Sequence, residues 1–371
     1  MTNAAAGQGR FGAAFEWLGI ERAWSRTRGR PEVVIGIVDH GVQSDHPLLA
    51  PNIRRDHARR PASAESDDPS GTWAAGIAAG RESATDGFAG VAPGSRILPV
   101  QFSPNGGAQT FDLAHAIEYA AEMGACIIVV SHTADVSSPS VLRAMQYAAT
   151  RNALVVCSAT RPPQNTTIEN AAPNLLCVLD VDARGQLLPG CLEAIAHLAA
   201  PGFARVPAWQ GAGCRDHTGP GLGAPHVAGC AALIKSLNPA WGYHEIREHL
   251  LSSATVVSEL ARRCQAGAVL NAAHAVLGPI ELEHETPPLK WTSLDDVEIR
   301  WKLRYRSAMC ANVVALYRAQ GSDHWRELGH TRARELRMTI PSEALRRSSG
   351  TLRLSARDSN FYADEIELTI V

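Results

Sequence analysis

Several side chains that can support hydrolysis occur beside apolar segments of this chain. Asp39 and His40 directly follow one such segment, Cys157 ends another, and Asp216 and His217 precede a glycine-rich stretch. Nucleophilic hydrolysis needs a hydroxyl or thiol, an imidazole that accepts its proton, and a carboxylate that orients the imidazole. Neighbouring residues on a strand point to opposite faces, so Asp39 and His40 are not expected to form a dyad.

The elements that would position these groups alternate between strand and helix. Residues 32–38 form a continuous apolar run, as in strands buried on both faces of a parallel sheet. Similar strands are expected over residues 96–102, 126–130, 153–157 and 175–181, and helices over 111–123, 141–149, 225–237, 244–251 and 271–276. This alternation predicts an α/β fold with a doubly wound parallel sheet flanked by helices.

The pattern changes near Gly278 and Pro279, which predicts a second domain. We expect the first domain over residues 1–279 and the second over residues 280–371. In the second part, short segments alternate between apolar and polar residues, at 297–301, 313–317, 334–340 and 365–370. Such segments predict a small antiparallel β-sandwich, similar in pattern to immunoglobulin and fibronectin modules.

The composition excludes several classes of protein. The chain has 371 residues, of which 45% are hydrophobic and 19% charged, so it can bury a large core. Its 35 basic and 37 acidic residues leave no electrostatic signature for nucleic acid or an anionic membrane. No apolar run approaches the ~20 residues that span a bilayer, and the first ten residues do not resemble a secretion signal. We therefore expect a cytoplasmic protein with no nucleic-acid or membrane partner.

The metal-binding residue types do not group into a site. The eight cysteines are scattered and lack the paired spacing of zinc ligands, which favours buried free thiols. Asp67 and Asp68 are adjacent carboxylates without further oxygen ligands, so a solvated loop is expected rather than a calcium site. The sequence therefore predicts neither a metal nor a cofactor.

Four ordered blocks resemble the subtilisin-like serine proteases, the subtilases of peptidase family S8. They are Val34 to Val42 with Asp45-His46-Pro47, then Ser70-Gly71-Thr72-Trp73-Ala74-Ala75-Gly76, then Gly90-Val91-Ala92-Pro93-Gly94, then Gly219-Pro220-Gly221-Leu222-Gly223-Ala224-Pro225-His226-Val227-Ala228-Gly229. Their order and spacing imply the subtilisin-like fold over most of the first 280 residues. In this resemblance Pro225 and His226 have a structural role at a helix start.

The resemblance also implies that the catalytic groups are lost. Asp39 matches the triad aspartate, whereas Ser70 stands at the histidine base and Gly221 at the serine nucleophile. Arg161 stands where the family has its oxyanion-hole asparagine. A serine hydroxyl cannot act as a base near neutral pH, and glycine has no side chain to attack with. The chain is thus identified as a degenerate member of the family, a pseudoprotease.

Two arrangements remain open for Asp39, which lacks its imidazole partner. In one, Arg161 pairs with this carboxylate, because an unpaired buried charge is costly. In the other, backbone donors and Ser70 satisfy Asp39, and Arg161 points to solvent.

The peptide cleft of the family does not depend on the triad, because substrate adds as an extended strand through main-chain hydrogen bonds. The resemblance places this cleft along segments 102–106, 131–134 and 158–160, and Trp73, at a family histidine, could fill part of it. The peptide-binding residues expected from it are Ser103, Asn105, Gly106, Ser131, His132, Thr133, Ser158, Ala159 and Thr160.

Three functions follow as hypotheses. The first is an inactive protein that binds a peptide or protein segment in the former cleft, either presenting a precursor peptide or regulating a partner enzyme. The second is a serine-type endopeptidase with a rearranged site that uses His40, His217, Cys157 or Ser131. The third is a scaffold that acts through the β-sandwich.

Overall fold

The chain divides into two compact units, residues 1–276 and 277–371, close to the boundary expected at residues 279 and 280. Each unit is described by itself. The computed structural model describes residues 10–55, 68–102, 112–130, 138–158, 172–189, 196–278, 280–282, 296–304, 312–341, 344, 350–357 and 363–370.

The first unit is built on an eight-stranded sheet with the order β2-β1-β3-β4-β5-β6-β10-β9. All neighbouring strands are parallel except β9, which pairs antiparallel with β10. The strands are β1 Val34–Asp39, β2 Arg96–Gln101, β3 Ile127–Val130, β4 Leu154–Ser158, β5 Leu175–Val181, β6 Leu198–Pro201, β9 Thr255–Val256 and β10 Ala268–Val269. The predicted doubly wound α/β fold is confirmed.

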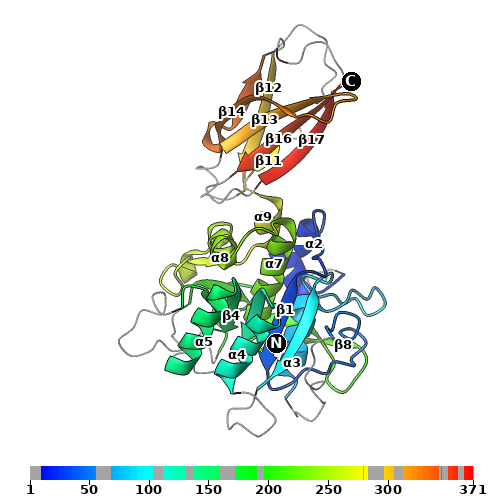
Figure 1. Ribbon diagram of the computed structural model, residues 1–371, viewed down its shortest axis with the longest axis vertical. Coiled ribbons are helices and arrows are strands. Elements are labelled where there is room, and N and C mark those ends of the chain that lie inside the picture. The colour runs from blue at the N-terminus through cyan, green and yellow to red at the C-terminus, as the bar shows by residue number, and fades with distance from the viewer. Residues whose placement is uncertain are drawn as a thin grey trace. The chain divides into compact units, whose positions relative to one another are not determined.

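Helices cover both faces of this sheet, and β1 shows why (Figure 1). Ile35 and Ile37 belong to the core shared with α3 and α7, whereas Val34 and Val38 belong to the core shared with α4 and α5. Every residue of β1 is buried, which explains its unbroken apolar sequence. The helices are α1 Ala13–Leu18, α2 Ile20–Ala23, α3 Ser70–Ala79, α4 Leu113–Glu122, α5 Pro139–Thr150, α7 Gly223–Leu237, α8 Tyr243–Ser252 and α9 Ala272–Leu277.

Local capping sets the start of two helices. The Asp112 side chain accepts the His115 backbone N–H, so α4 begins after Asp112 rather than at residue 111. Ser138 caps α5 in the same way, and Pro139 follows at the first helical position. In the described ranges, no helix is long and apolar enough to cross a membrane.

A hairpin of β7 Phe203–Pro207 and β8 Cys214–Thr218 leads to the glycine-rich turn before α7. Helix α7 then packs very closely on α3. A Cβ added at Gly229 would lie 2.8 Å from the Ala78 carbonyl oxygen, so only glycine allows this approach. The backbones of α3 and α7 are thereby in close contact.

The second unit contains two antiparallel sheets, with the orders β11-β12-β15 and β14-β13-β16-β17. Their shared core includes Trp301, Leu352 and Leu354. The strand expected over 334–340 begins only at Arg337, because a short 3-10 helix precedes it and Leu336 is left-handed. The strands are β11 Ile280–Leu282, β12 Val297–Leu303, β13 Asn312–Ala319, β14 Arg326–Arg332, β15 Arg337–Ile340, β16 Gly350–Arg357 and β17 Ala363–Ile370.

Candidate functional site

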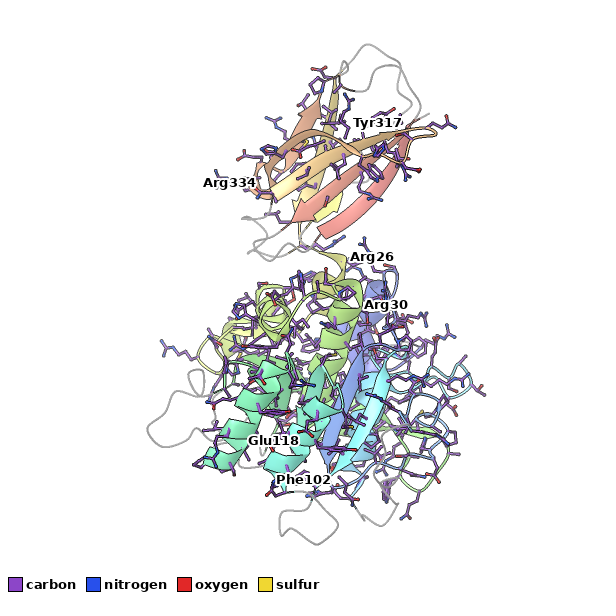
Figure 2. The ribbon with its side chains drawn as sticks, viewed as in Figure 1. Arg26, Arg30, Phe102, Glu118, Tyr317 and Arg334 are labelled. Carbon is purple, nitrogen blue, oxygen red and sulfur yellow. The ribbon has the colours of Figure 1, made fainter. Side chains whose placement is uncertain are left out.

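The candidate site lies where β1 and β2 end. Asp39 is the last residue of β1, and its side chain is 1% exposed. Its backbone carbonyl accepts the N–H of Phe102, the residue after β2. Figure 2 shows Phe102 at this carboxyl edge, whereas Arg30 lies near the opposite edge, where β1 begins. Functional side chains commonly lie beyond the carboxyl ends of strands in parallel sheets.

A hydroxyl group fills the position expected for the imidazole. The Ser70 Oγ donates a hydrogen bond of 2.6 Å to Asp39 Oδ1, and the His40 backbone N–H donates to the same oxygen at 2.7 Å. These are the donors of the second arrangement considered for Asp39. Arg161 lies outside the described residues, so its pairing with Asp39 stays a prediction.

Asp68 lies in a loop with its side chain 40% exposed, and it contacts both Ser70 and His40. Its Oδ1 accepts the Ser70 backbone N–H at 2.9 Å, and its Oδ2 lies 3.1 Å from His40 Nδ1. Partial burial opposes the charge of Asp68, but the hydrogen bonds from Ser70 and His40 outweigh it and lower its pKa. The physical reason is helix entry: Ser70 begins α3, and Asp68 supplies an acceptor for its amide. Asp67 lies outside the described residues.

His40 does not form a dyad with Asp39. Its Nδ1 is 3.9 Å from Asp39 Oδ1, beyond hydrogen-bond distance, and lies closer to Asp68. Its ring stacks on Phe102 at a centroid distance of 5.1 Å. The His40 side chain is thus held between a carboxylate and an aromatic ring.

Gly71 lets α3 begin directly against Asp39. A Cβ at this position would lie 2.2 Å from the Gly41 carbonyl oxygen and 2.8 Å from Asp39 Cβ. Both distances are far below ordinary contact, so the helix start requires glycine here. The hydroxyl of Ser70 is thereby placed next to the buried carboxylate.

The glycine-rich turn before α7 is bound by a carboxylate from the sheet. Gly221 has φ 94°, a conformation that favours glycine. Its backbone N–H donates to Asp180 Oδ2 at 2.9 Å, and the Gly223 N–H donates to Asp180 Oδ1 at 2.6 Å. The Leu222 N–H also contributes a hydrogen bond to this carboxylate.

Asp180 is buried within β5, with an exposed fraction of 3%. Burial raises its pKa from 3.8 to about 6, even though the three backbone donors favour the charged form. The amino end of a helix offers N–H groups that bind anions, including the oxyanion of acyl transfer. In this protein those N–H groups are already bound by Asp180.

The sequence interpretation missed Asp180 as a site residue. The available signal was a single carboxylate inside the apolar run Leu175–Val181, every residue of which is buried. A buried carboxylate needs hydrogen-bond donors, and the nearest free donors are the amides of a turn.

Asp216 and His217, the other candidate carboxylate and imidazole, contact different residues. Asp216 accepts a hydrogen bond from Arg205 Nε at 3.1 Å, whereas the His217 ring packs against Trp73 in a tilted arrangement at a centroid distance of 4.1 Å. Burial and then the charge of Arg215 lower the pKa of His217. Trp73 therefore packs against the β8 strand of the hairpin.

Two further titratable residues, His226 and Cys157, are buried in the core. His226 is 1% exposed, and its Nδ1 lies 2.9 Å from the Leu222 carbonyl oxygen. Burial lowers the pKa of His226 to about 4, so the ring is neutral at pH 7. Cys157 is buried in β4, as expected of a core thiol. Within the described ranges, no three His, Cys, Asp or Glu residues are grouped to hold a metal.

Of the expected peptide-binding residues, the structure describes only Ser158, which ends β4 and is 4% exposed. The others lie outside the described residues, as does the candidate nucleophile Ser131. These are Ser103, Asn105, Gly106, Ser131, His132, Thr133, Ala159 and Thr160.

Comparisons with known proteins give a consistent picture. The sequence pattern of the Subtilase family, Peptidase_S8, matches residues 30–273. The chain is 33% identical over 219 residues to the thermophilic serine proteinase of Bacillus sp. (strain AK1), covering 58% of this chain and 55% of the relative. It is 31% identical over 221 residues to thermitase of Thermoactinomyces vulgaris, covering 58% of this chain and 78% of thermitase. The chain thus spans about half the length of the first relative.

Solved structures share the fold. MycP3 protease from the type VII (ESX-3) secretion system has a TM-score of 0.55 and 24% identity, covering 73% of this chain and 90% of MycP3. The prenylagaramide maturation protease PagA has a TM-score of 0.56 and 24% identity, covering 70% of this chain and 97% of PagA. The sequence expectation of a subtilisin-like fold is therefore confirmed.

Proposed function

Because the chain belongs to the subtilase family, we propose that it is an inactive member which binds a peptide or protein segment in the family's cleft. Its bound segment is a precursor peptide held for another enzyme, or a part of a partner enzyme that it regulates. The proposal is carried by one observation: the turn at the nucleophile position has no attacking side chain, and its amides are bound by Asp180.

Each step of serine-protease chemistry lacks a group at the family position. Gly221 provides no nucleophile, and Ser70, whose hydroxyl donates to Asp39, provides no base. The Gly221 N–H points to Asp180 rather than to a reacting carbonyl. Loss of single triad members already removes most of the catalytic rate, so these changes together favour an inactive site.

The relatives are named as proteases, which makes an active peptidase the main alternative. It would need a rearranged nucleophile and base. The geometry of the described candidates does not favour this, because His40 contacts Asp68 and Phe102, and His217 packs against Trp73. Cys157 is buried and has a raised pKa, caused first by its hydrogen bond with Cys177. A thiol buried in the core is not accessible to a peptide bond, and its raised pKa leaves little thiolate to attack a carbonyl carbon.

Peptide binding by strand addition uses main-chain groups and survives loss of the triad. This is why we assign binding rather than catalysis to the cleft. We also place the protein in the cytoplasm, since six described cysteines are free thiols, as is usual in a reducing compartment. Neither a metal nor a cofactor is needed for this function.

A peptide-retention experiment tests the binding proposal. The purified chain is immobilised and incubated with a diverse peptide pool, and retained peptides are eluted and identified by mass spectrometry. We expect a defined subset to be retained, and Gly106→Trp, in a segment that resembles the family's cleft wall, to reduce retention by about tenfold or more. Val256→Trp is the matched control, because Val256 is 71% exposed on β9, at the opposite edge of the sheet from β2.

The scaffold hypothesis predicts a different outcome. A protein that acts through its second unit would keep its ligand in the Gly106→Trp variant. It would lose the ligand when an exposed residue of the β-sandwich, such as Thr339 on β15, is replaced by tryptophan. Equal retention by the wild-type chain and the Gly106→Trp variant would therefore contradict the proposal that the peptide binds in the cleft.

A further inference from the structure

Two cysteines lie side by side on neighbouring strands of the central sheet. Cys157 of β4 and Cys177 of β5 are direct partners in the parallel register. Both side chains belong to the core on the same face of the sheet, and their sulfur atoms are 3.5 Å apart. Neighbouring strands lie about 4.8 Å apart, within the Cα separation of about 4.4–6.8 Å that disulfides span.

The two thiols differ in their chemistry. The hydrogen bond from the Cys157 thiol is the largest factor that lowers the pKa of Cys177, and His197 and the charge of Arg247 act in the same direction against burial. The same hydrogen bond raises the pKa of Cys157, and burial adds to this. The hydrogen bond between the sulfurs therefore lowers the pKa of Cys177 and raises that of Cys157, on two residues that are direct partners in the sheet.

We propose that Cys157 and Cys177 are a modification site at which hydrogen peroxide forms a reversible intramolecular disulfide. Cys157 adjoins Ser158, an expected residue of the peptide cleft, but both sulfurs belong to the core, and the proposal does not rest on peptide binding.

The reaction balances with hydrogen peroxide as the only oxidant. The Cys177 thiolate attacks one peroxide oxygen, the O–O bond breaks, and the leaving hydroxide takes a proton to become water. Cys177 is then a sulfenic acid. The Cys157 sulfur attacks Cys177 sulfur as its proton leaves, the S–O bond breaks, and a second water forms. The two sulfurs lose two electrons in total, and one peroxide is reduced to two waters.

Burial selects the oxidant. Cys157 is 1% exposed and Cys177 is 0% exposed, so bulky disulfide reagents cannot approach either sulfur in the folded protein. The proposal therefore names hydrogen peroxide as the oxidant, because it is small and uncharged. Cys230 is an internal comparison: it is also fully buried, but burial raises its pKa to about 12 and no described cysteine lies within hydrogen-bond distance of it.

The test is peptide mapping of the full-length folded protein before and after hydrogen peroxide. We expect a cross-linked peptide joining Cys157 and Cys177, a loss of two hydrogen atoms from the intact mass, and full reversal by dithiothreitol. Cys230→Ser should oxidise as the wild type does. Cys157→Ser should lose the cross-link and accumulate sulfenic acid at Cys177, trapped by dimedone after unfolding.

Wild-type mapping alone decides the proposal if a variant fails to fold. The proposal is overturned if the two cysteines remain reduced while other cysteines oxidise, or if Cys177 is oxidised to sulfinic acid without any cross-link to Cys157. It is also overturned if the cross-link forms only in urea, because the native register would then not be its cause.

Discussion

The carboxylate of Asp180 accepts the backbone N–H of Gly221 at 2.9 Å and that of Gly223 at 2.6 Å. The amino end of a helix is a ready binding site for an anion, and here the anion is part of the chain itself. A substrate carbonyl at this turn would have to compete with a carboxylate that is permanently attached. The missing nucleophile at Gly221 and the binding of Asp180 to the amino end of α7 therefore both support an inactive site.

Asp180 predicts a pH dependence of stability in the first unit. Its pKa is about 6 in the folded protein and 3.8 ordinarily, so between these values the folded state holds a proton that the unfolded state has lost. The contribution of Asp180 to the free energy of unfolding should therefore fall as pH rises from about 4 to about 6, by on the order of 2–3 kcal/mol, and should stay level above that.

Asp180→Asn provides the comparison for this prediction. Urea unfolding of both proteins is followed by the loss of hydrogen-exchange protection in α7, which reports on the first unit alone. His226 gives a pH dependence of opposite sign, because its pKa is lowered from 6.5 to about 4, but it is present in both proteins and cancels in the difference. If the difference in free energy of unfolding between the wild type and Asp180→Asn does not change between pH 4 and pH 6, the raised pKa of Asp180 is contradicted.

Ser70→Ala should destabilise the first unit. The substitution removes the hydroxyl that donates to the buried Asp39 at 2.6 Å, and we expect a loss of about 1–3 kcal/mol. Ser25→Ala is the matched control, because the Ser25 hydroxyl bonds an exposed carbonyl and its loss should change stability by less than about 0.5 kcal/mol. Equal urea midpoints for the two variants would show that the Ser70–Asp39 hydrogen bond does not stabilise the fold.

Gly71→Ala should be far more damaging than its size suggests. The added methyl group would lie 2.2 Å from the Gly41 carbonyl oxygen, so α3 must move away from Asp39. We expect a loss of several kcal/mol, of the order seen for severe overpacking. Gly213→Ala is the control in the same unit, since the nearest atom to its Cβ would be 4.0 Å away. The measurement is the thermal unfolding midpoint of each variant. Similar midpoints would show that residue 71 is not in close contact with the Gly41 carbonyl oxygen.

Reintroducing two catalytic side chains should not restore a protease. The double variant Ser70→His, Gly221→Ser would supply a base and a hydroxyl, but residue 221 has φ 94°, which costs a non-glycine residue about 1–2 kcal/mol. Its amide would still be bound by Asp180. We expect no covalent labelling at residue 221 by a fluorophosphonate probe, with the thermophilic serine proteinase of Bacillus sp. (strain AK1) as the positive control. Rapid labelling of the double variant would show that Asp180 does not block the site.

Most of the fold could be predicted because apolar periodicity reflects burial directly. The strand β5 was expected over its observed range, Leu175–Val181, since every residue in it is buried. The strand β14, Arg326–Arg332, was not predicted, because all its residues are exposed or half-buried and show no apolar alternation. Its place in the sheet depends on pairing with β13, which is a property of the folded chain.

Only the site residues that lie in the family's sequence blocks could be predicted from the sequence. Asp39, Ser70 and Gly221 were found by resemblance to sequence blocks. Asp180 and Asp68 were not, because each acts through backbone amides that come close only on folding. A carboxylate in a buried strand signals that such donors exist, but sequence alone does not say which amides they are.

Cleavage of a diverse peptide pool by the purified chain tests the central claim most directly. Intact-mass analysis should find no new peptide fragments after prolonged incubation, for the wild type and for an Asp39→Asn variant alike. Fragments that form with the wild type and not with Asp39→Asn would contradict the account, because they would show that the carboxylate at the end of β1 still supports catalysis.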